Sequence, residues 1–128
     1  AVTTGDLTEE LVPFHKLSQW LTYSLVEPLE EGGIVVTDRD GLTALAEYRN
    51  GGLILDSGLV TLRDPRATEH PHPPGSEIVV EWRALTIVLV DRIAEGIRTE
   101  LGATPETLPL GNVLEGGTWA AGRMLARE

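Results

Sequence analysis

Apolar residues recur at steps of three and four between about residues 8 and 31, at Phe14, Leu17, Leu21, Leu25 and Leu29. This spacing predicts an amphipathic helix with one apolar face. Pro28 is expected to kink or end that helix, and the glycine pair at 32–33 to stop it. A short second helix is expected through residues 42–47, with its cap at Thr37, Asp38 or Asp40 and an interruption at the glycines 51–52.

The pattern from residue 53 to residue 62 fits two structures equally well. It suits two short strands around an Asp-Ser-Gly turn, or a helix that is followed by a tight turn at Gly58. The next segment, residues 63–75, contains four prolines and is expected to be a surface loop.

A long helix is expected over residues 77–101. Ser76 can cap it, Glu77 lies in its first turn, where the helix dipole favours an acid, and Gly102 follows its end. Apolar side chains occupy nearly every face between residues 78 and 90, which predicts a helix that runs through the middle of the fold. Residues 116–118, Gly-Gly-Thr, are expected to break the chain before a final helix. The pattern therefore predicts a mainly α fold, with at most a short β-hairpin near residues 53–62.

Composition limits the classes of function. The chain has 128 residues, 41% hydrophobic and 23% charged, which is typical of one soluble globular unit over residues 1–128. It has no cysteine, so disulfides, thiolate nucleophiles and cysteine-ligated zinc are excluded. Its net charge of -10 is the wrong sign for nonspecific nucleic-acid binding. The sequence has no apolar stretch of the roughly 20 residues that span a membrane and no signal peptide, so a cytoplasmic location is expected.

Acidic residues are concentrated at the start of the chain. Residues 1–33 hold six acids and one lysine, a net charge of -5, whereas residues 34–66 hold five acids and four arginines, a net charge of -1. The middle of the chain is therefore where positive charge can meet a substrate. Because the chain begins at Ala1 and stops at Glu128 within a helical pattern, both ends are expected to be cut from a longer protein.

Residues 47–52, Glu-Tyr-Arg-Asn-Gly-Gly, are the first candidate site. A carboxylate, a phenol, a guanidinium and an amide converge there beside flexible backbone and could hold a polar substrate. The alternative is a helix end at which Arg49 pairs with Glu47 or bonds to terminal carbonyls.

Residues 81–83, Glu-Trp-Arg, are the second candidate, because charged groups in so apolar a helix must be paired or face a wet cavity. Glu81 and Arg83 are two positions apart and cannot pair with each other. A structural network with Glu77 and Arg92 fits the same residues.

Two weaker candidates follow. The glycine turn before Trp119, with Arg123, could receive an anion, but a helix stop and restart explains it as well. His70 and His72 lie in the proline-rich loop without a third ligand, so no metal is expected, and no cofactor is expected either.

Several strings resemble a known family. Residues 14–25, 47–52, 75–77 with 81–86, and 114–123 are similar to the uracil catabolism family of bacteria and fungi, a domain of unknown function. Members are about three times this length. The resemblance therefore implies that these residues are the C-terminal portion, on which the missing N-terminal portion packs.

Residues 42–49, together with 75–77 and 81–83, are also similar to the queuosine-salvage N-glycosidases, whose fold is related to helix-hairpin-helix DNA glycosylases. Those proteins have Asp-Tyr-Arg where this chain has Glu47, Tyr48 and Arg49, but residues 50–52 depart from their Val-Pro-Gln. This likeness implies that residues 53–56 are helical and that Gly58 is a turn.

The family resemblance implies a ribosylurea intermediate, and breaking its N-glycosidic bond would release urea. Such a reaction needs a carboxylate at an oxocarbenium-like transition state and a donor for the departing nitrogen. The expected roles are a base or electrostatic carboxylate (Glu47), a second acid (Glu81), substrate-orienting or substrate-contacting groups (Arg49, Asn50, Arg83), and walls for the sugar or urea (Tyr48, Trp82, Trp119).

Two other classes of function compete with this one. The alternative is a noncatalytic interaction domain that organises uracil-pathway enzymes. A phosphoribosyl-transferring enzyme is disfavoured, because the sequence has no adjacent acidic pair in a strand-to-loop setting.

Overall fold

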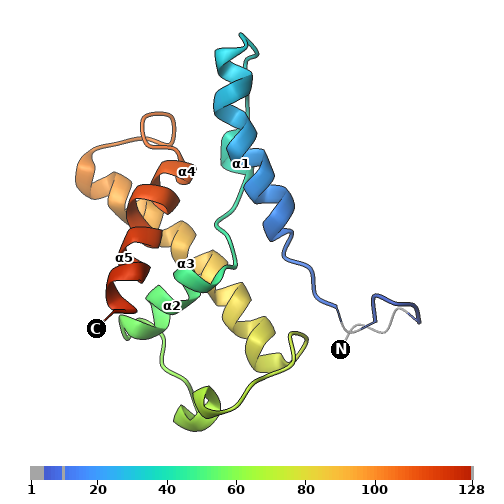
Figure 1. The fold of residues 1–128 in the computed structure, drawn as a ribbon. Helices are drawn as coiled ribbons and strands as arrows, with labels where there is room; N and C mark the ends of the chain where they lie inside the picture. Colours follow the sequence, from blue (N-terminus) through green and yellow to red (C-terminus); the bar gives the residue numbers. More distant parts are fainter. Residues whose placement is uncertain (1–4, 10, 128) are drawn as a thin grey trace.

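The computed structural model describes residues 5–9 and 11–127, in which every regular element is a helix (Figure 1). The predicted mainly α fold is therefore confirmed. The two ends of the chain, Ala1 and Glu128, and one of the six acidic residues in 1–33, Glu10, lie outside the described residues. The elements in chain order are α1 (Lys16–Glu31), the 3-10 helix η1 (Arg39–Gly41), α2 (Tyr48–Asp56), the 3-10 helix η2 (Pro65–Glu69), α3 (Glu77–Leu101), α4 (Leu110–Asn112), the π-helix η3 (Val113–Thr118) and α5 (Trp119–Leu125).

The first helix starts later than its apolar spacing predicts. Residues 11–15 are not helical, because Pro13 lacks an N–H and disfavours a helical conformation at the residue before it, while His15 has a φ of 49°. α1 continues through Pro28 and stops at Gly32, as the glycine pair predicts.

The helix expected over residues 42–47 is wrong. Only the short η1 forms, and the chain then runs without regular structure to α2. The reason is tertiary: the Ala44 N–H donates to Asp91 Oδ1 (2.7 Å), and the Leu45 carbonyl accepts from Asn50 Nδ2 (3.2 Å). Both Ala44 and Leu45 are buried. Their backbone groups therefore form hydrogen bonds to side chains instead of the backbone hydrogen bonds of a helix.

α2 resolves the ambiguity at residues 53–62 in favour of a helix. Leu53–Asp56 are helical and Gly58 turns the chain with a φ of +73°. The expected interruption at residues 51–52 is wrong, because both glycines lie inside α2. Gly51 serves close packing there: a Cβ at this position would lie 2.6 Å from the Trp82 ring.

α3 crosses the middle of the molecule, as its apolar pattern predicts (Figure 1). It buries Thr86, Val90 and Ala94 and ends at Gly102, whose φ is 61°. Ser76 occupies the N-cap position, but its hydroxyl makes no capping bond.

The expected break at residues 116–118 is also wrong. α4, η3 and α5 form one continuous helical run, in which the two glycines belong to the π-helical turn. α5 lies directly against α2, since a Cβ on Gly122 would be 2.5 Å from the Arg49 carbonyl oxygen. The buried apolar side chains among the described residues come from the 44–45 segment, α2, α3, η3 and α5: Ala44, Leu45, Ile54, Val90, Ala94, Val113, Leu114 and Trp119.

α1 stands beside this core rather than within it (Figure 1). The Tyr23 hydroxyl donates to the Thr43 carbonyl (2.9 Å), and the Trp20 ring centroid lies 4.8 Å from that of Trp119. None of the α1 residues is buried. Within the described part of the chain, no helix has the length and apolar character that crossing a membrane requires.

Candidate functional site

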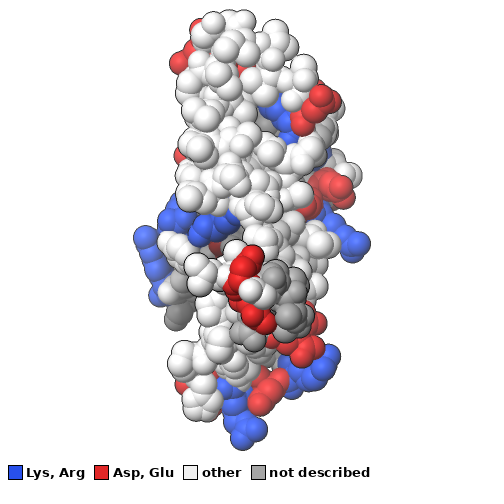
Figure 2. All heavy atoms as spheres, turned by 90° about the vertical axis from the view of Figure 1, so that its right-hand side faces the viewer, with Lys and Arg blue, Asp and Glu red and all other residues white. Residues whose placement is uncertain are grey.

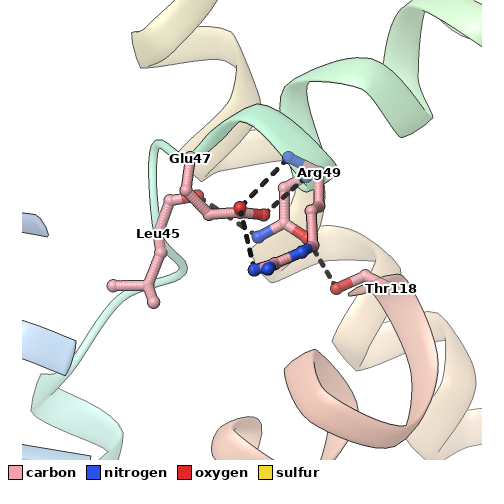
Figure 3. A network of polar contacts seen from close by, with 5 residues as sticks. Leu45, Glu47, Arg49 and Thr118 are labelled. Carbon is pink, nitrogen blue, oxygen red and sulfur yellow. Dashed lines mark hydrogen bonds and ion pairs between the residues drawn. The ribbon is translucent and has the colours of Figure 1, made fainter. Parts of the chain in front are cut away.

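The carboxylate of Glu47 caps the N-terminus of α2 (Figure 3). Glu47 has an extended backbone, and its oxygens accept hydrogen bonds from the Asn50 N–H (2.7 Å) and the Arg49 N–H (3.0 Å). A negative group at this helix end satisfies free N–H donors and opposes the positive end of the helix dipole. Only 7% of Glu47 is exposed, so the carboxylate has a fixed position.

The guanidinium of Arg49 lies between that carboxylate and two aromatic rings. Arg49 Nη1 is 3.7 Å from Glu47 Oε2, and the guanidinium carbon is 4.8 Å and 5.4 Å from the ring centroids of Tyr48 and Trp119. These are cation–π distances. Since about a third of the Arg49 side chain remains exposed (32%), it can still bind a ligand.

Asn50 ties the start of α2 to η3. Its amide donates to the Leu45 carbonyl and accepts from the Thr118 hydroxyl (2.7 Å), and Asn50 is fully buried. This bond joins residues 68 positions apart in the sequence. It holds the Glu47 cap next to the π-helical turn.

These groups border an open cavity of about 530 Å³. This is a common size for a small-molecule site. Three basic groups, two carboxylates and three aromatic rings contribute to its wall. The lining residues are Lys16, Leu17, Trp20, Leu45, Glu47, Tyr48, Arg49, Glu115, Trp119 and Arg123.

The charge of the cavity differs from that of the chain. Lys16, Arg49 and Arg123 give three positive charges against the two negative charges of Glu47 and Glu115, whereas the whole chain carries -10. Within the described residues, neither Lys16 nor Arg123 forms an ion pair. The cavity can therefore attract a polar or anionic ligand to an acidic protein.

Trp119 contributes a buried indole to this wall. It is 8% exposed, and its Nε1 finds no hydrogen-bond acceptor among the described residues. It directly follows the π-helical turn that contains Glu115. Single π-helical turns occur frequently at functional sites. The turn and the indole mark this end of the cavity as its most specialised part.

The second candidate group, Glu81, Trp82 and Arg83, does not line this cavity. Trp82 packs on Gly51 and donates from Nε1 to its carbonyl (3.2 Å). Arg83 donates to the Val12 carbonyl (3.2 Å) and lies over the Phe14 ring, so it holds the segment that leads into α1. Glu81 is exposed and borders a different hollow of about 430 Å³.

Reasoning from the sequence missed Lys16, Trp20 and Glu115 as neighbours of Glu47. Glu115 stands within a string that carries the family resemblance, at residues 114–123, which was the only signal for it. Arg123, named beside the glycine turn, does reach the cavity.

Two other titratable residues, Asp91 and His72, do not line this cavity. Burial raises the pKa of Asp91, and the hydrogen bond from the Ala44 N–H partly opposes that shift. His72 Nε2 lies 2.7 Å from the Ala67 carbonyl within its own loop. No group of three or more metal-ligating side chains occurs in residues 5–9 and 11–127.

One protein family and two curated relatives match all or nearly all of the chain. A family described as a protein of unknown function (DUF1688) matches residues 1–128. The protein urg3 of Schizosaccharomyces pombe (strain 972 / ATCC 24843) is 42% identical in an alignment of 125 residues that covers 94% of this chain and 31% of that protein. Uracil catabolism protein 4 of Lachancea kluyveri is 38% identical in an alignment of 135 residues that covers 92% of this chain and 30% of that protein. No solved structure matches the chain.

The chain thus spans less than a third of the length of these two curated relatives. The match confirms the resemblance that residues 14–25, 47–52, 75–77 with 81–86, and 114–123 indicate. The chain belongs to the DUF1688 family of proteins of unknown function.

Proposed function

We propose that this chain provides much of the active site of an N-glycoside hydrolase in uracil catabolism, which cleaves a ribosylated urea and releases urea. The printed name of the Lachancea kluyveri relative supports the pathway. The observation that carries the chemistry is the cavity, in which two carboxylates, three cations and aromatic rings surround a space of about 530 Å³.

Glu47 is the electrostatic carboxylate in this proposal. Two N–H donors fix it at the wall of the cavity, so it need not reorganise when positive charge develops on the anomeric carbon. Arg49 lies beside it on the faces of Tyr48 and Trp119, and these rings give the sugar apolar walls. Arg49 itself donates hydrogen bonds to sugar or urea oxygens.

Glu115 takes the role of the second carboxylate. It is exposed and lines the same cavity as Glu47, whereas Glu81 borders another hollow. The oxygen of a water molecule bonds to the anomeric carbon while the carbon–nitrogen bond breaks and leaves its electron pair on the urea nitrogen. The water's proton passes to the Glu115 carboxylate and from there to that nitrogen, which gives ribose and urea.

The test is an assay of urea release from ribosylurea by the complete natural protein and two matched variants. Glu115→Gln should lower turnover by roughly 10²- to 10⁴-fold, the usual worth of a general acid or base. Glu81→Gln makes the same change on an exposed carboxylate outside the cavity and should leave turnover unchanged. Equal rates for the two variants would exclude this role for Glu115, and absence of turnover in the unmodified protein would exclude the proposed reaction.

Glu47→Gln needs a stability measurement beside the assay. Glutamine offers one acceptor oxygen where glutamate offers two, so one capping bond of α2 is lost, which costs about 1 kcal/mol. Turnover that falls further than the folded fraction assigns Glu47 to catalysis. Turnover that follows the folded fraction leaves Glu47 only its capping role.

The noncatalytic interaction domain remains the competing proposal. Ribose and ribosylurea should raise the melting temperature of the complete protein, and Arg49→Ala should abolish that shift, if the cavity binds substrate. No shift, together with capture of pathway enzymes, would favour the interaction domain.

A further inference from the structure

The outward side of α1 is a row of leucines. Leu17, Leu21, Leu25 and Leu29 recur every four residues and are exposed to 79%, 57%, 46% and 39%. We call these four residues the leucine face. Helical spacing places Ser18 and Pro28 between these leucines and Thr22 and Ser24 at the two edges of the face, and none of the four carries a charge.

The charged residues of α1 all lie outside the leucine face. Helical spacing places Lys16, Glu27 and Glu30 on the side of Trp20 and Tyr23, the two aromatic residues that contact the rest of the molecule. The fourth charged residue, Glu31, lies next to Trp20, at the border between that side and Leu17. Figure 2 shows the result: the upper part of the molecule, over α1, is mostly uncharged, with acidic groups and a neighbouring basic group toward its edges. α1 therefore turns its uncharged side to solvent.

The exposed apolar surface continues beyond the helix. The Ile34 N–H donates to the Leu29 carbonyl (2.9 Å), and Ile34 and Val35 are 55% and 84% exposed. Contiguous apolar surface of this kind marks an interface, because folded monomers seldom leave it in water. α1 buries none of its own residues, so hydrophobic burial offsets little of the conformational entropy that the helix loses when it forms.

The length of the relatives indicates what covers this surface. The chain covers 31% and 30% of the two curated relatives, so more than two thirds of each relative lies outside the matched region. Permanent interfaces are nearly as apolar as the core of a domain, whereas transient interfaces are more polar. The uncharged leucine face is of the first kind.

We propose that the leucine face packs against an apolar surface of the remaining part of the same polypeptide in the full-length family protein. Leu17 belongs both to this face and to the wall of the cavity that contains Glu47. A segment that covers Leu17 therefore borders the cavity mouth and supplies a wall that the described residues leave open.

The test is site-specific alkylation of the complete natural protein, read by mass spectrometry of the modified peptide. Leu21→Cys places a thiol on the leucine face, and Leu59→Cys places one at an apolar residue of similar exposure, 54%, in the turn after α2. This chain has no cysteine of its own, so each peptide reports one thiol. Both variants should react at equal rates in denaturant.

In the native protein, Leu21→Cys should react at least about tenfold more slowly than Leu59→Cys, because a covered site reacts only through local opening. Equal native rates would overturn the proposal. Protection that disappears on dilution would also overturn it, since that result assigns the face to a second copy of the chain. Ser18→Cys, at an exposed position between Leu25 and Leu29 by helical spacing, changes the volume of the face little and provides the same readout if Leu21→Cys does not fold.

Discussion

Replacement of Gly122 by alanine tests whether close contact between α5 and α2 determines the geometry of the site. The added Cβ would lie 2.5 Å from the Arg49 carbonyl oxygen, and the neighbouring atom is backbone rather than a flexible side chain. Ordinary contact begins at 3.4 Å, so the two helices must separate locally by 3.4 - 2.5 = 0.9 Å. Arg49 itself carries the guanidinium that lies over Trp119.

The magnitude follows from two opposing effects. Overpacking of this kind costs about 1–3 kcal/mol. Alanine in a helix is favoured over glycine by about 0.5–1 kcal/mol. We therefore expect Gly122→Ala to lower the free energy of unfolding by up to about 2.5 kcal/mol, which changes the folding equilibrium by up to roughly 70-fold.

The matched control is Gly96→Ala in α3, where a Cβ would meet no atom within 4 Å. Only the propensity effect acts there, so this variant should be more stable than the parent by about 0.5–1 kcal/mol. Denaturation in urea, with the midpoints compared at equal slope, measures both values. If Gly122→Ala is as stable as Gly96→Ala, the close approach of α5 to Arg49 is refuted.

Two further predictions concern buried polar groups. Thr118→Val removes the donor to Asn50 Oδ1 in a fully buried site and should destabilise the protein by about 1–3 kcal/mol. Thr99→Val, in which the exposed hydroxyl bonds only within its own helix, should change stability little in the same denaturation assay. Burial raises the pKa of Asp91, so the native state binds its proton more tightly than the unfolded state does. The stability that this proton contributes is complete below the ordinary aspartate pKa and disappears as the pH rises through the raised value. Asp91→Asn keeps an acceptor for the Ala44 N–H, so its stability relative to the parent should increase as the pH rises from below the ordinary aspartate pKa through the raised value, and a constant difference would contradict the reasoning.

Local signals in the sequence predict several elements well. The length of α3 follows from residues near its ends, because Ser76 stands at the N-cap position, Glu77 opens the first turn and Gly102 adopts a positive φ after the last. The mainly helical class and the stop of α1 at Gly32 follow in the same way. Three residues of the candidate string 47–52, Glu47, Tyr48 and Arg49, do line one side of the cavity. The sequence predicted the end of a helix there, however, whereas the structure has the start of α2.

Other features depended on contacts between distant residues. When only the sequence is considered, a glycine predicts a break in a helix. Gly51 nevertheless lies inside α2 and Gly122 inside α5, because each allows another part of the chain to approach closely. Sequence spacing likewise gave no reason to prefer Glu115 over Glu81 as the neighbour of Glu47. That choice was made by packing, which joins η3 to the start of α2 through Thr118 and Asn50.

The sequence by itself determined the helical class, the family, the acidic balance of the chain and residues 47–52 as a candidate site. The tertiary structure decided which groups share a cavity with that carboxylate and which side of α1 is left uncovered. The physical reason is the range of the interactions. Caps, helical periodicity and glycine stops act within a few residues along the chain. Cavity walls and buried hydrogen bonds join residues that become neighbours only when the core packs.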